Sequence, residues 1–218
     1  MRTRAILWDM DGVLADTGEA HFVAWQRMFA EQGFTLTREE FAHTFGMANP
    51  AILRHWLGPD LPRERIDALA ERKEALFREG VAEVRPLPGV CKWLEWAKAH
   101  GIRQAVASSG EMANIAAIVA VLEIGNYFDA LVSGAFLPKS KPDPAVFLQA
   151  AGALGVAPEE CLVIEDGVVG VEAAARAGMR CLALTTTHPA ERLEGADLVI
   201  ECLEDLSEAT FAGLLGIA

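Results

Sequence analysis

The chain has 218 residues, of which 52% are hydrophobic and 23% are charged, an ordinary globular composition with ample material for a core. Its formal net charge is −12, from 19 basic and 31 acidic residues, and no basic stripe runs along it. This balance excludes a nucleic-acid backbone as an expected partner. A small anionic ligand stays open, because the local charge of a site can oppose the net charge.

The N-terminal run and the cysteines predict a reduced, cytoplasmic protein. The apolar run after MRTR ends at Asp9, too early for a signal-peptide core, and no run approaches the roughly 18 apolar residues of a membrane span. None of the four cysteines forms a CxxC pair, and Cys161 and Cys181 begin apolar runs where a free thiol acts as a small hydrophobe. We therefore expect no membrane partner and a monomer, with an oligomer left open.

The first predicted strand, residues 5–8, runs directly into two aspartates, Asp9 and Asp11, followed by Gly12. Because Asp and Gly are common in turns, an ordinary strand-to-loop turn is one interpretation. Residues two apart in extended chain point the same way, so both carboxylates can face one site. Like charges this close disfavour each other's ionisation unless a cation or a proton lies between them. The arrangement therefore suggests a function.

Residues 16–82 show no strand signal. The first helical pattern carries one apolar stripe, made by His21, Phe22, Trp25, Met28 and Phe29. Further helical patterns occur at residues 37–45, 49–57 and 62–80. We interpret residues 16–82 as an all-helical cap domain inserted into a core formed by residues 1–15 and 83–218. Since the insert begins right after the two aspartates, we expect it to cover them.

After the insert, short apolar runs alternate with helical patterns. The runs are residues 104–108, 130–134, 162–166 and 181–185, and the helical patterns are residues 88–101, 114–122, 144–154 and 168–178. Continuous apolar strands of this kind fit a parallel sheet that is covered on both faces. The predicted fold class is α/β, a doubly wound Rossmann-like sheet with the helical cap inserted after its first strand.

Polar residues follow the predicted strands, at the edge where ligands bind in open α/β sheets. Ser108 ends the second run, Glu165 and Asp166 end the fourth, and Lys141 lies between the third and the fourth. Each also has an interpretation without a functional site. Ser108 could cap a helix, Glu165 and Asp166 could lie in a loop or at a helix N-terminus, and Lys141 could be a solvated charge. Their joint appearance at successive strand ends favours one site. Oxygen ligands with little nitrogen or sulfur favour Mg²⁺ over zinc.

These residues resemble the four motifs of the haloacid dehalogenase superfamily of phosphotransferases. The DxDG motif matches DMDG at Asp9, the Ser motif matches Ser108, the Lys motif matches Lys141 in SKPDP, and the paired acid matches EDG at Glu165. All four occur in order, the resemblance covers the whole chain, and the insert stands where the family places a cap.

The resemblance implies a mechanism. Asp9 is the nucleophile that forms an aspartyl phosphate, Asp11 is the acid and base, and Lys141 and Ser108 hold the phosphoryl oxygens. It also implies a Mg²⁺ ion at a group of acidic residues: Asp9, Asp11, Glu165 and Asp166. The implied activity is Mg²⁺-dependent hydrolysis of a small phosphate monoester, a sugar phosphate or a similar metabolite.

Within the superfamily, the chain is most similar to the β-phosphoglucomutase and phosphoglycolate phosphatase branch, through Thr17, His21 and Trp25 at the start of the cap and Lys73 in ERKEAL. This implies a set of substrate-binding residues: Gly12, Thr17, His21, Asn49, Lys73 and Ser109. An ordinary interpretation is also open, in which His21 is a packed helix residue and Lys73 a solvated charge.

The chain departs from the mutase pattern at two places. Asn49 stands where the mutase has an arginine for the distal phosphate, and Gly110, Glu111 and Met112 stand where it has Ser-Lys-Asn contacts. A glutamate there repels a second phosphate. We therefore expect a phosphatase, and the alternative is a β-phosphoglucomutase that interconverts β-glucose 1-phosphate and glucose 6-phosphate.

Two other classes share parts of this pattern. A response-regulator receiver also has a phosphorylated Asp, a hydroxyl and a Lys on a parallel sheet, but it is shorter, carries its acid pair before that strand and has no insert after the first strand. The second class is a catalytically inactive binding protein. Every core motif residue is present, so nothing in the sequence favours this class.

Overall fold

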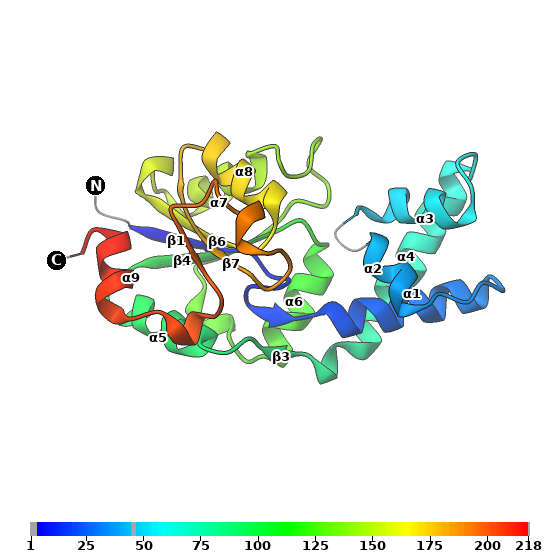
Figure 1. Cartoon of the computed structure of the whole chain (residues 1–218), viewed down its shortest axis with the longest axis horizontal. Coiled ribbons are helices and arrows are strands. Elements are labelled where there is room, and N and C mark those ends of the chain that lie inside the picture. Colours follow the sequence, from blue (N-terminus) through cyan, green and yellow to red (C-terminus); the bar gives the residue numbers. More distant parts are fainter. Residues whose placement is uncertain (1–3, 45–46, 218) are drawn as a thin grey trace. The chain divides into compact units, whose positions relative to one another are not determined.

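The computed structural model describes residues 4–44 and 47–217 and is shown in Figure 1. The backbone divides into two units. The core unit comprises the described residues of Met1–Asp16 and Arg85–Ala218, and the insert unit is Thr17–Val84. Each unit has its own packed interior.

A six-stranded parallel sheet forms the centre of the core unit, in the order β5-β4-β1-β6-β7-β8. Its strands are β1 (Ala5–Trp8), β4 (Arg103–Ser108), β5 (Ala130–Ser133), β6 (Cys161–Glu165), β7 (Arg180–Leu184) and β8 (Leu198–Ile200). The first five match the predicted runs, and the doubly wound fold class is confirmed. The sixth was not predicted, because it is a three-residue edge strand that is only half-buried.

Helices cover both faces of the sheet (Figure 1). They are α5 (Val90–Ala99), α6 (Met112–Val121), α7 (Ala145–Leu154), α8 (Val168–Arg176) and α9 (Glu208–Leu215). Figure 1 shows α7 and α8 on one face and α5 and α9 on the other. Alternate strand residues such as Ala5 and Leu7 join one apolar cluster with Phe147 of α7 and Ala174 of α8. This alternation of side chains between the two faces follows from the period-2 geometry of strands.

The opposite face carries a buried polar residue whose hydrogen bonds are satisfied. Gln104, fully buried in β4, accepts a hydrogen bond from the indole of Trp8 at 3.0 Å. Its own amide donates to the carbonyl oxygens of Leu94 at 3.0 Å and Tyr127 at 3.3 Å. Because each polar atom has a partner, the desolvation of this amide is compensated.

Two very short strands stand where the chain leaves and re-enters the core unit. They are β2 (Ala15–Asp16) and β3 (Arg85–Pro86), and they pair antiparallel with Ala15 opposite Pro86 and Asp16 opposite Arg85. Strands of two residues have no periodicity to read in the sequence, and we did not predict them.

The insert unit is helical, as predicted, with α1 (Gly18–Glu31), α2 (Arg38–Thr44), α3 (Asn49–Leu57) and α4 (Arg63–Gly80). The expected helix at residues 37–45 extends beyond α2 to Phe45, which lies outside the described residues. The predicted stripe of α1 is buried at Phe22, Trp25, Met28 and Phe29 and half-buried at His21. The stripe packs against α4, whose Leu69, Leu76 and Phe77 are also buried.

Short 3-10 helices connect the remaining elements, at Val81–Glu83, Gly125–Tyr127, Pro158–Glu160, Ala190–Arg192 and Leu203–Asp205. Among the helices of the described ranges, none is both long and apolar enough to cross a bilayer. All four cysteines are free, and Cys161 and Cys181 lie buried in β6 and β7, as expected of small hydrophobes.

Candidate active site

The register of the sheet brings the first and fourth motifs together. Trp8 lies opposite Val106 of β4 and opposite Ile164 of β6, so Asp9 and Glu165 leave neighbouring parallel strands at the same level. The backbone N–H of Asp9 donates to the carbonyl of Ile164 at 3.0 Å, which continues the ladder one residue beyond β1. The predicted gathering of polar residues at the carboxyl edge is therefore present for these two acids.

Lys141 joins this pair through two short ion pairs. Its Nζ donates to Asp9 Oδ1 at 2.5 Å and to Glu165 Oε1 at 2.6 Å, and it also lies 3.4 Å from the carbonyl oxygen of Ala107. The lysine side chain is only 6% exposed. Burial by itself lowers the pKa of Lys141, but the charges of Asp9 and Glu165 outweigh it and raise that pKa above its usual value. The ammonium group therefore stays charged beside Asp9.

Three buried carboxylates form a cluster that fits a divalent cation. Asp9, Glu165 and Asp166 each offer one oxygen, and these atoms lie within 4.8 Å of one another. Burial raises the pKa of Asp9 well above its usual range, and burial followed by the charge of Glu165 raises the pKa of Asp166 to about 7. The ammonium group of Lys141 faces these three acids. Carboxylate oxygens with excess negative charge are the donor set that Mg²⁺ prefers.

Glu165 is held from two sides. Its Oε1 accepts from Lys141, and its Oε2 accepts the backbone N–H groups of Asp166 and Gly167, each at 2.8 Å. These two amides immediately precede α8, where backbone N–H groups have no partner within the helix. The carboxylate therefore fixes the position of Lys141 relative to the start of α8.

The DMDG turn packs against the fourth motif. Gly12 has φ +76° and donates its N–H to the carbonyl of Ala15 at 2.9 Å. An added Cβ at this position would lie 2.0 Å from Asp166 Oδ2. A side chain is therefore excluded here both by backbone conformation and by space. Asp11, next to this glycine, is half-buried, and its charge raises the pKa of both Asp9 and Asp166.

Ser108 ends β4 and is 2% exposed, while Ser109 is exposed. The Ser108 hydroxyl oxygen accepts the N–H of Gly110 at 3.0 Å. The N-cap of the following helix, α6, is Glu111. The alternative interpretation of Ser108 as a helix cap is therefore wrong. Lys141 contacts the carbonyl of Ala107, the residue before Ser108, so the second and third motifs are neighbours.

The predicted cap residues form a hydrogen-bonded cluster within the insert unit. Lys73 Nζ lies 2.9 Å from His21 Nδ1 and donates to Glu74 Oε1 at 2.9 Å. Asn49 Nδ2 donates to the same oxygen at 2.7 Å. The His21 ring stacks on Phe77, with ring centroids 4.2 Å apart. Lys73 is 2% exposed, so its interpretation as a solvated charge is wrong. Thr17, the N-cap of α1, is also buried.

One contact at the acid cluster was not predicted. Thr187, in the loop after β7, donates its hydroxyl hydrogen to Asp166 Oδ2. The sequence carries a signal for it, because the run at residues 181–185 is followed by further threonines, and the strand-end rule applies to that run as well. For Glu74 we find no such signal beyond its position next to Lys73.

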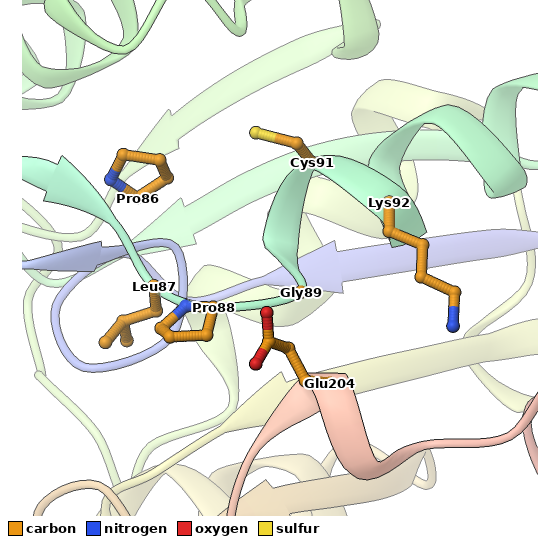
Figure 2. A pocket seen from close by; sticks show the side chains of 7 residues that line it. All are labelled: Pro86, Leu87, Pro88, Gly89, Cys91, Lys92 and Glu204. Carbon is orange, nitrogen blue, oxygen red and sulfur yellow. The ribbon is translucent and has the colours of Figure 1, made fainter.

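A separate hollow on the core unit has a volume of about 600 Å³ and lies between the β3–α5 connection and Glu204 (Figure 2). It is lined by Pro86, Leu87, Pro88, Gly89, Cys91, Lys92 and Glu204. Since none of the predicted site residues lines it, the candidate active site is the acid cluster and not this hollow.

Comparisons with known proteins agree with this geometry. Residues 3–178 match the family model described as haloacid dehalogenase-like hydrolase. The chain is 32% identical to β-phosphoglucomutase of Bacillus subtilis, covering 94% of this chain and 92% of that protein, and 32% identical to phosphoglycolate phosphatase of Pseudomonas putida, covering 93% and 78%. A solved structure of a CbbY variant from Rhodobacter sphaeroides, in complex with xylulose 1,5-bisphosphate, matches with a TM-score of 0.84 at 28% identity, covering 95% of this chain and 97% of that one. By its motifs, its parallel sheet and these relatives, the chain belongs to the haloacid dehalogenase-like hydrolase family.

Proposed function

We propose that this protein is a Mg²⁺-dependent phosphatase that hydrolyses a small phosphorylated metabolite through an aspartyl phosphate. The observation that carries the proposal is the contact of Lys141 Nζ with Asp9 Oδ1 at 2.5 Å, in a cluster that also holds Glu165 and Asp166. A nucleophilic carboxylate beside a fixed cation is the arrangement that attack on an anionic phosphate requires.

In the first half-reaction, an oxygen of Asp9 attacks phosphorus, and the bond from phosphorus to the leaving alkoxide oxygen breaks. Asp11 gives its proton to that alkoxide, so the alcohol leaves in neutral form. Lys141 and the Ser108 hydroxyl hold the phosphoryl oxygens and stabilise the charge that develops on them. The acyl phosphate remains on Asp9.

In the second half-reaction, Asp11 accepts a proton from water as the water oxygen attacks the same phosphorus. The bond between phosphorus and Asp9 then breaks, which releases phosphate and restores the carboxylate. Asp9, Asp166 and the Asp11 backbone, with Glu165 in support, would hold a Mg²⁺ ion, which would supply charge neutralisation for the phosphate.

The relatives and the hydrogen-bonded cluster of the insert unit support the proposed substrate class. The neighbouring CbbY structure contains a sugar bisphosphate, and a phosphoglycolate phosphatase is among the relatives. We propose Gly12 and Ser109 as substrate-binding residues of the core unit. For the insert unit, we propose Thr17, His21 and Lys73 as substrate-binding residues. Asn49, whose amide bonds to Glu74, completes this set.

The deciding experiment is a phosphate-release screen with 2-phosphoglycolate, xylulose 1,5-bisphosphate and sugar monophosphates, in Mg²⁺ and in EDTA. We expect turnover of at least one compound in Mg²⁺ only. The Asp9→Asn variant should lose turnover, because an amide cannot form the acyl phosphate. Substantial turnover by that variant would refute the mechanism.

The second candidate is a β-phosphoglucomutase, favoured by the similarity to the Bacillus subtilis enzyme and by the His21–Lys73 contact of 2.9 Å. Glu111 argues against it, because its negative charge repels a second phosphate. The assay supplies β-glucose 1-phosphate, Mg²⁺ and a catalytic amount of glucose 1,6-bisphosphate. Formation of glucose 6-phosphate much faster than free phosphate would identify a mutase.

A further inference from the structure

Gly170, the third residue of α8, is buried, and its backbone conformation does not require a glycine. Its N–H bonds to the carbonyl of Gly167 at 3.0 Å, and its φ lies outside the left-handed region. A glycine inside a helix lowers stability relative to alanine, because it loses more conformational freedom on folding. The reason for a glycine at this position must therefore come from the space around it.

That space is filled by the side chain of Glu165. A Cβ added to Gly170 would lie 1.8 Å from Glu165 Oε1, 1.9 Å from Cδ and 2.4 Å from Oε2. The Glu165 carboxylate must therefore shift to make room for an alanine at this position. The shift is costly, because this side chain is only 3% exposed and three contacts hold its carboxylate. By contrast, Gly152, in the neighbouring helix α7, has nothing within 4 Å of an added Cβ.

We propose that Gly170 is a positioning residue, whose missing side chain lets Glu165 fold back over the start of α8 and hold Lys141 beside Asp9. The inference rests on the proposed function for its catalytic consequence, but its steric basis is independent of any substrate. Displacing the carboxylate breaks three contacts at once: the 2.6 Å pair with Lys141 and the two 2.8 Å bonds from the amides of Asp166 and Gly167.

The test compares Gly170→Ala with Gly152→Ala, a glycine-to-alanine change in a helix with open space. Gly152→Ala should raise the melting temperature by about 1–4 °C and leave turnover unchanged. Gly170→Ala should lower the melting temperature by roughly 3–8 °C, because overpacking outweighs the gain in helix propensity. It should also lower kcat at least about tenfold, because the lysine is then misplaced relative to the reacting atoms.

A double-mutant cycle isolates the contact. In a Glu165→Ala background the obstruction is gone, so Gly170→Ala should raise the melting temperature by about 1–4 °C, as at Gly152. This change of sign depends on the Gly170–Glu165 contact alone. If the single variant Gly170→Ala does not fold, the double variant of Glu165→Ala and Gly170→Ala should still fold. Its melting temperature, compared with that of Glu165→Ala, then tests the proposal.

The outcomes separate this inference from the proposed function. If the wild type hydrolyses no phosphate ester, the proposed function fails, while the sign of the stability change still decides the steric role of Gly170. The inference is overturned if Gly170→Ala raises the melting temperature in both backgrounds, or if it folds like the wild type and keeps full kcat in an active enzyme.

Discussion

Replacing Lys141 with methionine tests the electrostatics of the site apart from its chemistry. The change keeps a long apolar stem and removes the ammonium group that contacts Asp9 and Glu165 at 2.5 and 2.6 Å. Both carboxylates are nearly buried, with side chains 11% and 3% exposed, so they are left as unpaired buried charges. Removing one partner of a buried ion pair costs about 3–5 kcal/mol. For a chain of this size we expect the melting temperature to fall by roughly 10 °C.

The loss of stability in Lys141→Met should depend on pH in a defined direction. Burial already raises the pKa of Asp9, and without the opposing charge of Lys141 that pKa rises further. The folded variant then binds a proton at Asp9 more tightly than the unfolded chain does, so it gains stability as the pH falls. The deficit relative to the wild type should therefore be large at pH 8 and smaller at pH 5.

The assay is thermal unfolding in EDTA at both pH values, with Lys139→Met as the matched control. Lys139 is exposed in the same loop, so its replacement should change stability by no more than about 0.5 kcal/mol. Equal melting temperatures for Lys141→Met and wild type at pH 8, or an equal deficit at pH 5 and pH 8, would refute the reasoning.

Two further predictions concern the metal. In EDTA, the melting temperature of the wild type should fall as the pH rises from 5 to 7.5, because the folded-state pKa of Asp166, about 7, exceeds the unfolded value of roughly 3.9. Saturating Mg²⁺ should reduce that slope, and a flat profile in EDTA contradicts the prediction. Thr187→Val should weaken Mg²⁺ binding roughly 10–100-fold in calorimetric titration, because Asp166 loses its hydroxyl donor, whereas Thr187→Ser should bind normally. Equal affinities for the Val variant and the wild type would exclude this role.

The strand ends could be predicted because they depend on local sequence. Apolar runs of four or five residues located β1, β4 and β6, and parallel strands end at one edge, so Asp9, Ser108 and Glu165 could be assigned to that edge. The edge strand β8 was not predicted, because a segment of three half-buried residues is too short to show a hydrophobic pattern.

Side-chain contacts between distant segments could not be predicted in this way. The strand-end rule predicts only that the threonines after β7 lie at the carboxyl edge. It does not say that Thr187 in particular bonds to Asp166, and nothing in the local pattern says that Gly170 makes room for Glu165. The burial of Lys73 had a signal, because it shares a spacing of three and four residues with Ile66, Leu69, Leu76 and Phe77, all buried on α4. The many charges around it in the sequence obscured that stripe.

The pairing of β2 with β3 has a consequence for how the protein can change over evolution. Asp16 and Arg85 face each other across the ladder, so the backbone departs and returns at adjacent points of the same scaffold. The β2–β3 pairing holds the two ends of the inserted segment together. A change in the length of that segment therefore changes mainly the entropy cost of closing a loop, which grows slowly with length. A lineage can therefore lengthen, shorten or exchange the segment between these residues without shifting the register of any strand in the large sheet. The two-residue ladder makes that segment a replaceable module.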